Sequence, residues 1–197
     1  MGEKIATGWL KMTYEIGFDE FEKFFSDMEV AISVRKKRVE DDFEEQSKGL
    51  DDESKDEMFE YMYLDDYTTI NKSFPNILKR SMVISCYSFF EVQLKNLCDV
   101  LHRRYRFSSL GRKKNFGIIQ SKDYLIKTTD TFASLFESRL WEQVNEIRQI
   151  RNFIAHEGKS IVESGTELYR IILSLDNMIN LVHFTTRESG KVSRIQL

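Results

Sequence analysis

The chain has 197 residues, of which 31% are charged and 41% hydrophobic, and it contains nine Gly and one Pro. These values predict one folded, mostly helical domain over residues 1–197, and they disfavour both a second full-sized domain and wholesale disorder. The formal net charge is only −3, but residues 1–66 carry 20 acidic and 9 basic side chains, whereas residues 67–197 carry 12 and 20. This asymmetry is compatible with a nucleic-acid partner for the second part, and equally with two solvated faces of opposite sign that attract each other.

Export and membrane signals are not apparent in the sequence. Residues 1–6 lack the apolar region of a signal peptide, and nowhere do about 18 apolar residues follow one another. Cys86 and Cys98 are placed on one predicted helix, about 18 Å apart at 1.5 Å per residue, which is too far for a disulfide. We therefore expect a soluble cytoplasmic protein with reduced thiols and no membrane partner.

The N-terminal part predicts two helices. The first covers residues 18–48, and six of its apolar residues recur at helical spacings: Phe21, Phe24, Phe25, Met28, Ile32 and Val39. Gly49 predicts a break, and the acidic residues 51–53 favour the start of a second helix, which runs through Tyr67. Together these helices form an acidic N-terminal helical part, residues 1–74.

The remaining sequence predicts the bundle itself. Pro75 suits the first turn of a third helix, which needs no amide donor there and runs to about Arg106. The middle of this helix, residues 82–94, is apolar on nearly all sides, as expected for a central rod. The later segments are an exposed loop over residues 108–117, helices over residues 121–128 and 132–157, a last helix from Ser164 or Thr166, and a loose tail after Gly190. With no strand pattern, the chain predicts an all-α, up-and-down bundle of four to six helices.

Two charged residues are predicted to point into this bundle. A turn of about 100° per residue places Arg151 in the apolar arc of residues 140–154, and Glu91 in the apolar arc of residues 83–101. A buried charge is costly unless it is paired or used in function. Contact between the two is therefore expected, either as an ion pair that fixes helix register or as part of a site.

Arg151 begins a motif whose side chains are suited to catalysis. Asn152 follows it directly, His156 comes five positions later, and the last two share one helix face. Cleavage of RNA without a metal needs a base for the ribose 2′-hydroxyl proton, an acid for the leaving oxygen and cationic donors for the phosphate. Imidazole meets the first two needs and guanidinium the third, while the amide orients the phosphate or holds the His tautomer. Since Arg151 and His156 are about 140° apart on one helix, two protomers present them to one phosphate better than one does.

The string Arg-Asn-x-x-Ala-His near the end of an amphipathic helix resembles the motif of the HEPN family of all-helical ribonucleases. The resemblance covers residues 75–187, which we treat as a HEPN-like core. It implies a bundle of four to five helices that dimerises so that two motifs line one cleft, and metal-independent endoribonuclease activity linked to toxin–antitoxin, abortive-infection or CRISPR-type defence. It also implies catalytic roles for Arg151 and His156, a supporting role for Asn152 and, less directly, a role for Glu91.

A basic segment follows the central predicted helix. Six cations in it are candidates for binding RNA phosphates: Arg103, Arg104, Arg106, Arg112, Lys113 and Lys114. Tyr105, Phe107 and Phe116 offer rings on which bases stack. The alternative is a solvated helix end whose cations complement the helix dipole. Neither a metal site nor a cofactor site is predicted, because two Cys and three scattered His do not form one and no nucleotide-binding motif is present.

These patterns predict a metal-independent endoribonuclease that acts on RNA as a homodimer. His156 is the expected general acid and base, and Arg151 is expected to stabilise the transition state. Asn152 is expected to position the phosphate or the imidazole, and Glu91 to lie close to them. The expected further partner is a neutralising antitoxin or another defence-system subunit. Two alternatives are a catalytically silent helical interaction module, in which Arg151 pairs with Glu91, and an accessory or antitoxin subunit of a defence system.

Overall fold

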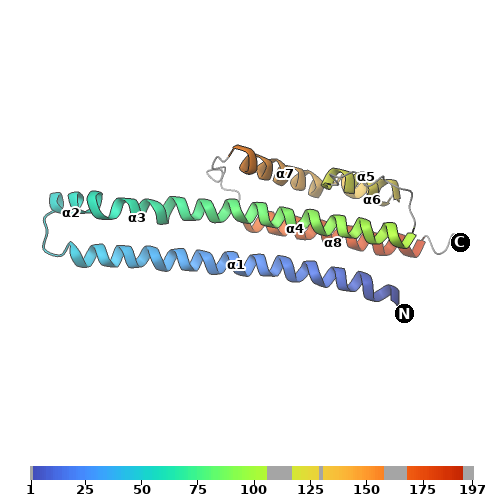
Figure 1. The fold of residues 1–197 in the computed structure, drawn as a ribbon, viewed down its shortest axis with the longest axis horizontal. Coiled ribbons are helices and arrows are strands. Elements are labelled where there is room, and N and C mark those ends of the chain that lie inside the picture. Colours follow the sequence, from blue (N-terminus) through green and yellow to red (C-terminus); the bar gives the residue numbers. More distant parts are fainter. Residues whose placement is uncertain (1, 106–116, 129–130, 158–167, 193–197) are drawn as a thin grey trace.

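The computed structural model describes residues 2–105, 117–128, 131–157 and 168–192, and every regular element in these ranges is a helix (Figure 1). The elements are α1 (Gly2–Gln46), α2 (Asp52–Met58), the π-helical turn η1 (Phe59–Tyr63), α3 (Leu64–Thr68), the π-helical turn η2 (Thr69–Ser73), α4 (Phe74–Tyr105), α5 (Ile118–Thr128), α6 (Thr131–Phe136), α7 (Arg139–Glu157) and α8 (Leu168–Val192). The predicted all-α class is confirmed for these residues. None of the described helices has both the length and the apolarity that a bilayer crossing requires.

The long helices α1, α4, α7 and α8 form the bundle, while α5 packs against α4 and α6 packs against α7 and α8 (Figure 1). α1 and α7 run in one direction while α4 and α8 run in the other, which is an up-and-down arrangement. α4 is central because it contacts α1, α5, α7 and α8. Four of its residues, Cys86, Phe90, Leu94 and Leu97, have no exposed surface. The helix predicted to be the central rod therefore lies at the centre of the bundle.

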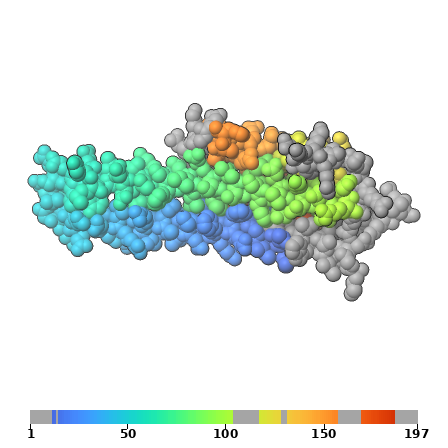
Figure 2. Space-filling model, viewed as in Figure 1, coloured from blue at the N-terminus to red at the C-terminus, as the bar shows by residue number. Residues whose placement is uncertain are grey.

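Beyond the bundle, α1 packs against η1, α3 and η2 in a slender two-helix arm, residues 34–73, which also includes α2 (Figures 1 and 2). The main hydrophobic core reaches along α1 only as far as Ile32. The arm has a small aromatic cluster of its own, in which Phe43 meets Phe59 and Tyr63 edge to face. The Tyr63 hydroxyl also donates to Asp42 Oδ2 at 2.8 Å. The arm is therefore held together separately from the bundle.

The break predicted at Gly49 is confirmed. Gly49 has a φ of +86°, which is the left-handed conformation that ends helices and favours Gly. The Asp51 carboxylate then accepts a hydrogen bond from the Ser54 N–H at 2.8 Å and caps α2. The first helix is longer than predicted, because α1 begins at Gly2 rather than at Phe18.

The helix predicted to begin at Pro75 is α4, which begins at Phe74 and ends at Tyr105, but no break separates it from the elements before it. The elements from Asp52 to Tyr105 follow one another without a gap, which makes one rod of about 80 Å at 1.5 Å per residue. In η2 the Phe74 N–H donates to the Thr69 carbonyl, five residues earlier instead of four. Pro75 has no N–H to donate and would normally break a helix. It is tolerated here because the hydrogen-bond pattern of the rod already changes at η2.

The prediction of a single helix over residues 132–157 is wrong, because the structure divides this segment into α6 and α7. Ser138 makes the division. Its hydroxyl donates to the Leu135 carbonyl at 2.6 Å, and its own carbonyl accepts from the Trp141 N–H at 3.0 Å. A serine that competes for backbone hydrogen bonds in this way ends one helix and starts the next.

Two other predicted helices are present with small differences at their ends. The helix predicted over residues 121–128 is α5, which begins three residues earlier, at Ile118. The last predicted helix is α8, whose bounds are Leu168 and Val192. The first two residues of the tail predicted after Gly190 therefore belong to a helix, and the rest of that tail lies outside the described residues. The loop predicted over residues 108–117 lies outside the described residues except for Gly117.

Candidate active site

Arg151 lies on α7 and faces the central helix α4. Its guanidinium carbon is 5.7 Å from the centre of the Tyr87 ring, and the side chain is half-buried. This inward position is the one predicted from helical periodicity. A guanidinium stacked on a buried aromatic face is held by a cation–π interaction, which is stronger where water is excluded.

Asn152 fixes the same guanidinium from the side. The Arg151 Nη1 donates to Asn152 Oδ1 at 2.9 Å. Asn152 thus orients Arg151, rather than the phosphate or His156, to which it was assigned from sequence. With Tyr87 beneath it and Asn152 beside it, Arg151 has two independent restraints on its position.

His156 lies in the last turn of α7 and is exposed. It is five residues beyond Arg151, which corresponds to about 7.5 Å along the axis and about 140° around it. The structure therefore does not bring the imidazole and the guanidinium together within one chain.

Glu91 does not form the ion pair expected with Arg151. Both residues are described, and no ion pair within 4.0 Å joins them; such pairs elsewhere on the chain include Lys36 with Glu40. Glu91 Oε1 instead lies beside Gly117, where an added Cβ would be 3.0 Å from it. Gly117 immediately precedes α5, so the carboxylate is close to the positive end of that helix.

Tyr87 lies near the charges of Glu91, Arg148 and Arg151, and the sequence analysis did not predict it as part of the site. The side chain is 2% exposed. Burial raises the pKa of its hydroxyl, the nearby charge of Glu91 raises the pKa further, and the charges of Arg148 and Arg151 lower it. The detectable signal in the sequence is its spacing, since Tyr87 is four residues before Glu91 and so shares its helix face.

Arg148 is a second residue that the sequence reasoning missed. It is half-buried on α7, three residues before Arg151 and therefore its neighbour on the helix surface. The Nε atoms of Arg148 and Arg151 are both buried without a hydrogen-bond partner. Two arginines from α7 and two residues from α4 thus form one polar cluster inside the bundle.

Among the predicted RNA-binding cations, Arg103 has a described side chain, and it is not part of this cluster. Arg103 is exposed near the end of α4, 16 residues after Tyr87 and therefore about 24 Å farther along the helix. Arg104 lies on α4, but its side chain is outside the described residues. The other four are also outside them: Arg106, Arg112, Lys113 and Lys114.

Compared with known proteins, the chain matches no family model, no curated protein and no solved structure. Function is therefore inferred from the residues of the cluster and from the motif that contains them.

The cluster is suited to binding an anion. A restrained guanidinium presents planar N–H donors to two oxygens of one phosphate, and preorganised donors of this kind stabilise charge that develops during a reaction. An exposed imidazole on the same helix is accessible to a substrate and is chemically able to take and return a proton. Within the described residues, no group of three or more His, Cys, Asp and Glu side chains is arranged to hold a metal ion.

Proposed function

We propose that the protein is a metal-independent endoribonuclease of HEPN type that works as a homodimer. The observation that carries the proposal is the state of the motif on α7: Arg151 is fixed by Tyr87 and Asn152, while His156 is exposed. A fixed cation and an accessible proton carrier are the two parts that cleavage of a phosphodiester requires. The resemblance of the motif to that of HEPN ribonucleases supports the same reaction.

In the proposed reaction, the neutral imidazole of His156 takes the proton of the ribose 2′-hydroxyl as its oxygen attacks phosphorus. The bond from phosphorus to the 5′-oxygen breaks, and the leaving oxygen receives a proton from an imidazolium. Arg151 donates to the non-bridging oxygens as negative charge gathers on them. The products are a 2′,3′-cyclic phosphate and a 5′-hydroxyl, and atoms and charge balance without a co-reactant.

The proposed dimer follows from the geometry of α7. Since Arg151 and His156 point about 140° apart on one helix, one phosphate is served best by Arg151 of one protomer and His156 of another. A two-fold axis that relates two α7 helices creates two such combinations at once. The protomer is then an incomplete enzyme.

We further propose a cytoplasmic toxin or defence role, in which an antitoxin or another subunit restrains the activity. The motif resemblance is the support for this setting. Expression of the wild-type chain should slow growth of the host cells, and the His156→Ala variant should relieve the effect.

The decisive assay incubates purified protein with single-stranded and structured RNA in EDTA. His156→Ala and Arg151→Ala are each expected to lower the cleavage rate by about 10²- to 10⁴-fold. Two exposed residues on the same helix, changed as Gln149→Ala and Arg139→Ala, are matched controls that should cleave at the wild-type rate. If the wild-type protein leaves all RNA intact across salt and pH, the nuclease proposal is rejected.

A second candidate function, a protein-interaction module, is favoured by the arm. Large apolar side chains are exposed there, with Tyr61 95% and Met62 60% accessible. Met62 also lines a groove of about 700 Å³ together with Val34 and Arg38 of α1. Exposed apolar surface of this kind is typical of contact sites. Two results together would support this function instead. The wild-type protein would not cleave RNA, and the Tyr61→Ser variant would lose a protein that copurifies with the wild type.

A further inference from the structure

We infer that Arg148 is a second phosphate-binding arginine, and that Arg148 and Arg151 together form a two-guanidinium site for the RNA backbone. The identity of the ligand as RNA rests on the proposed function. The anion site itself follows from the contacts of α7 with α4.

The first step is that two like charges lie close to one buried tyrosine. Arg151 stacks on Tyr87 at 5.7 Å, and Arg148 is close enough for its charge to act on the same hydroxyl. Both side chains are half-buried, and residues three apart on a helix are neighbours. Two cations in such an arrangement repel each other and lose hydration, so an anion between them removes a double penalty.

The second step is that Glu91 is not this anion. No ion pair within 4.0 Å joins Glu91 to Arg148 or to Arg151, all three of which are described. The Glu91 carboxylate lies beside Gly117, at the start of α5. There the helix dipole stabilises it. The two arginines are thus neighbours on α7 without a carboxylate from the described residues in an ion pair with either.

The third step is that both arginines have donors to spare. The Nε of Arg148 and the Nε of Arg151 are buried and have no hydrogen-bond partner. A buried donor without a partner is costly, so such a pair is expected at a place where a ligand supplies acceptors. The planar fork of a guanidinium, formed by Nε and one Nη, matches two oxygens of one phosphate.

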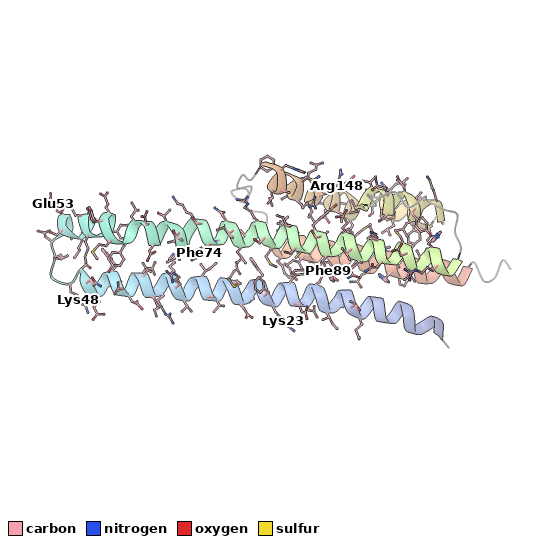
Figure 3. All side chains as sticks on the ribbon, in the orientation of Figure 1. Lys23, Lys48, Glu53, Phe74, Phe89 and Arg148 are labelled. Atoms are coloured by element: carbon pink, nitrogen blue, oxygen red, sulfur yellow. The ribbon has the colours of Figure 1, made fainter. Side chains whose placement is uncertain are left out.

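The fourth step connects Arg148 with the proposed chemistry. Arg148, Asn152 and His156 succeed one another at intervals of four residues, so they form one ridge about 12 Å long on α7. Figure 3 shows Arg148 on α7, which lies along α4. In the proposed dimer, an RNA strand that follows this ridge places one phosphate on Arg148 and Arg151 of one protomer, where the exposed imidazole of the other protomer reaches it. Arg148 then positions the strand, while His156 acts on it.

The test measures binding of a fluorescently labelled single-stranded RNA in EDTA, with His156→Ala in every protein so that the RNA is not cut. Adding Arg148→Gln is expected to weaken binding about tenfold or more, because a charged hydrogen bond to phosphate is lost. The plot of log affinity against log salt should also become shallower by about 0.7, the value for one phosphate contact on a single strand. The matched control is Arg139→Gln, an exposed arginine at the other end of the same helix, which should change neither quantity.

Two further measurements distinguish the sources of phosphate and separate binding effects from folding effects. Inorganic phosphate should raise the melting temperature of the wild-type protein above its value in chloride of equal ionic strength, and Arg148→Gln should remove this rise. If phosphate stabilises the protein through Arg148 but RNA does not bind, the site takes a free phosphate and the RNA assignment is overturned. If Arg148→Gln does not fold, Arg148→Lys replaces it in the test. Lysine keeps the positive charge but lacks the planar guanidinium. An unchanged RNA affinity of the folded Arg148→Lys protein overturns the inference.

Failure of this inference differs from failure of the nuclease proposal. Equal RNA affinity and equal salt dependence in the Arg148→Gln and Arg139→Gln proteins overturn the role of Arg148, even if the wild-type protein cleaves RNA. Conversely, wild-type protein that binds RNA through Arg148 but never cuts it rejects the nuclease and leaves the anion site intact.

Discussion

The guanidinium carbon of Arg151 lies 5.7 Å from the centre of the buried Tyr87 ring, so a core residue of α4 holds the arginine of the α7 motif. The hydrogen bond from Arg151 to Asn152 adds a second restraint at 2.9 Å. A donor that is fixed before the substrate arrives needs no reorganisation during the reaction, and this is the condition under which charge stabilisation is most effective. Catalysis and core packing are therefore coupled through one aromatic ring.

The first prediction tests this coupling with two substitutions of Tyr87. Tyr87→Leu removes the ring, and we expect the cleavage rate to fall about 2- to 30-fold, the equivalent of a cation–π interaction of about 0.5–2 kcal/mol. Tyr87→Phe keeps the ring and should stay close to the wild-type rate. Single-turnover RNA cleavage measures the effect, and circular dichroism checks that both variants fold. An equal loss in both variants would show that the hydroxyl, and not the ring, supports Arg151.

The second prediction concerns the composite site. Arg151→Ala and His156→Ala should each be inactive, and a mixture of the two should recover activity, because a mixed dimer has one site with both side chains. Random pairing makes about half of the dimers mixed, each with one of two sites intact, so about a quarter of the wild-type rate is expected. The measurement is RNA cleavage after subunit exchange at low protein concentration.

The control for this experiment replaces the His156→Ala partner by a chain that carries both substitutions. That mixture has no intact site and should remain inactive. If native mass spectrometry shows mixed dimers of the two single variants and they do not cleave RNA, Arg151 and His156 do not act across a two-fold axis.

The third prediction concerns the contact between α1 and α4 at Gly17. A Cβ at this position would overlap the Phe89 ring, which is labelled in Figure 3 and meets Phe18 and Phe21 edge to face. In an open helix, Gly→Ala stabilises by about 1 kcal/mol. Here we expect Gly17→Ala to destabilise the fold by about 1–3 kcal/mol, because the ring cannot move without disturbing its neighbours.

Urea unfolding followed by circular dichroism measures the effect of Gly17→Ala. A second variant adds Phe89→Leu, which removes the obstructing ring, and in this background the alanine should cost less than it does alone. The same cost in both backgrounds would mean that Phe89 is not the obstacle.

The sequence is sufficient to predict that Arg151 points inward, because side-chain direction in a helix follows from position alone. It is not sufficient to predict the partner, which depends on how α4 and α7 are staggered along their axes. Reasoning from charge selects Glu91, but the structure places the Tyr87 ring, one turn earlier, against the guanidinium. The carboxylate is placed at Gly117. The role of Arg148 depends on the same stagger.

The ends of the helices show the same limit. The break at Gly49 is predictable because a left-handed residue and a cap act locally. The division at Ser138 is not, since serine is common inside helices and only its 2.6 Å hydrogen bond to the Leu135 carbonyl decides the outcome. At Pro75 the local signal is real, but the π-helical turn before it lets the rod continue.

The fourth prediction concerns alkaline pH and the two thiols of α4. Burial raises the pKa of Cys86 and of Cys98 to about 12, from an ordinary value near 9.0. Above pH 9 the unfolded chain therefore releases protons that the folded chain retains. The stability that depends on neutral thiols is complete below pH 9 and is lost as pH rises from about 9 to 12. Between pH 8 and 10 the two thiols together should lower the free energy of unfolding by about 2–3 kcal/mol.

The matched protein for this measurement is the double variant Cys86→Ala and Cys98→Ala, compared with wild type by urea unfolding at pH 8, 9 and 10. Burial also raises the pKa of Tyr124, to about 12, but that hydroxyl ionises in the unfolded chain only near pH 10. The tyrosines are the same in both proteins, so the difference between the two proteins isolates the thiols. The double variant should be less stable at pH 8, because it has small cavities, but its stability should change less between pH 8 and 10. If both proteins lose the same free energy over this range, the thiols are not the groups whose ionisation opens the core.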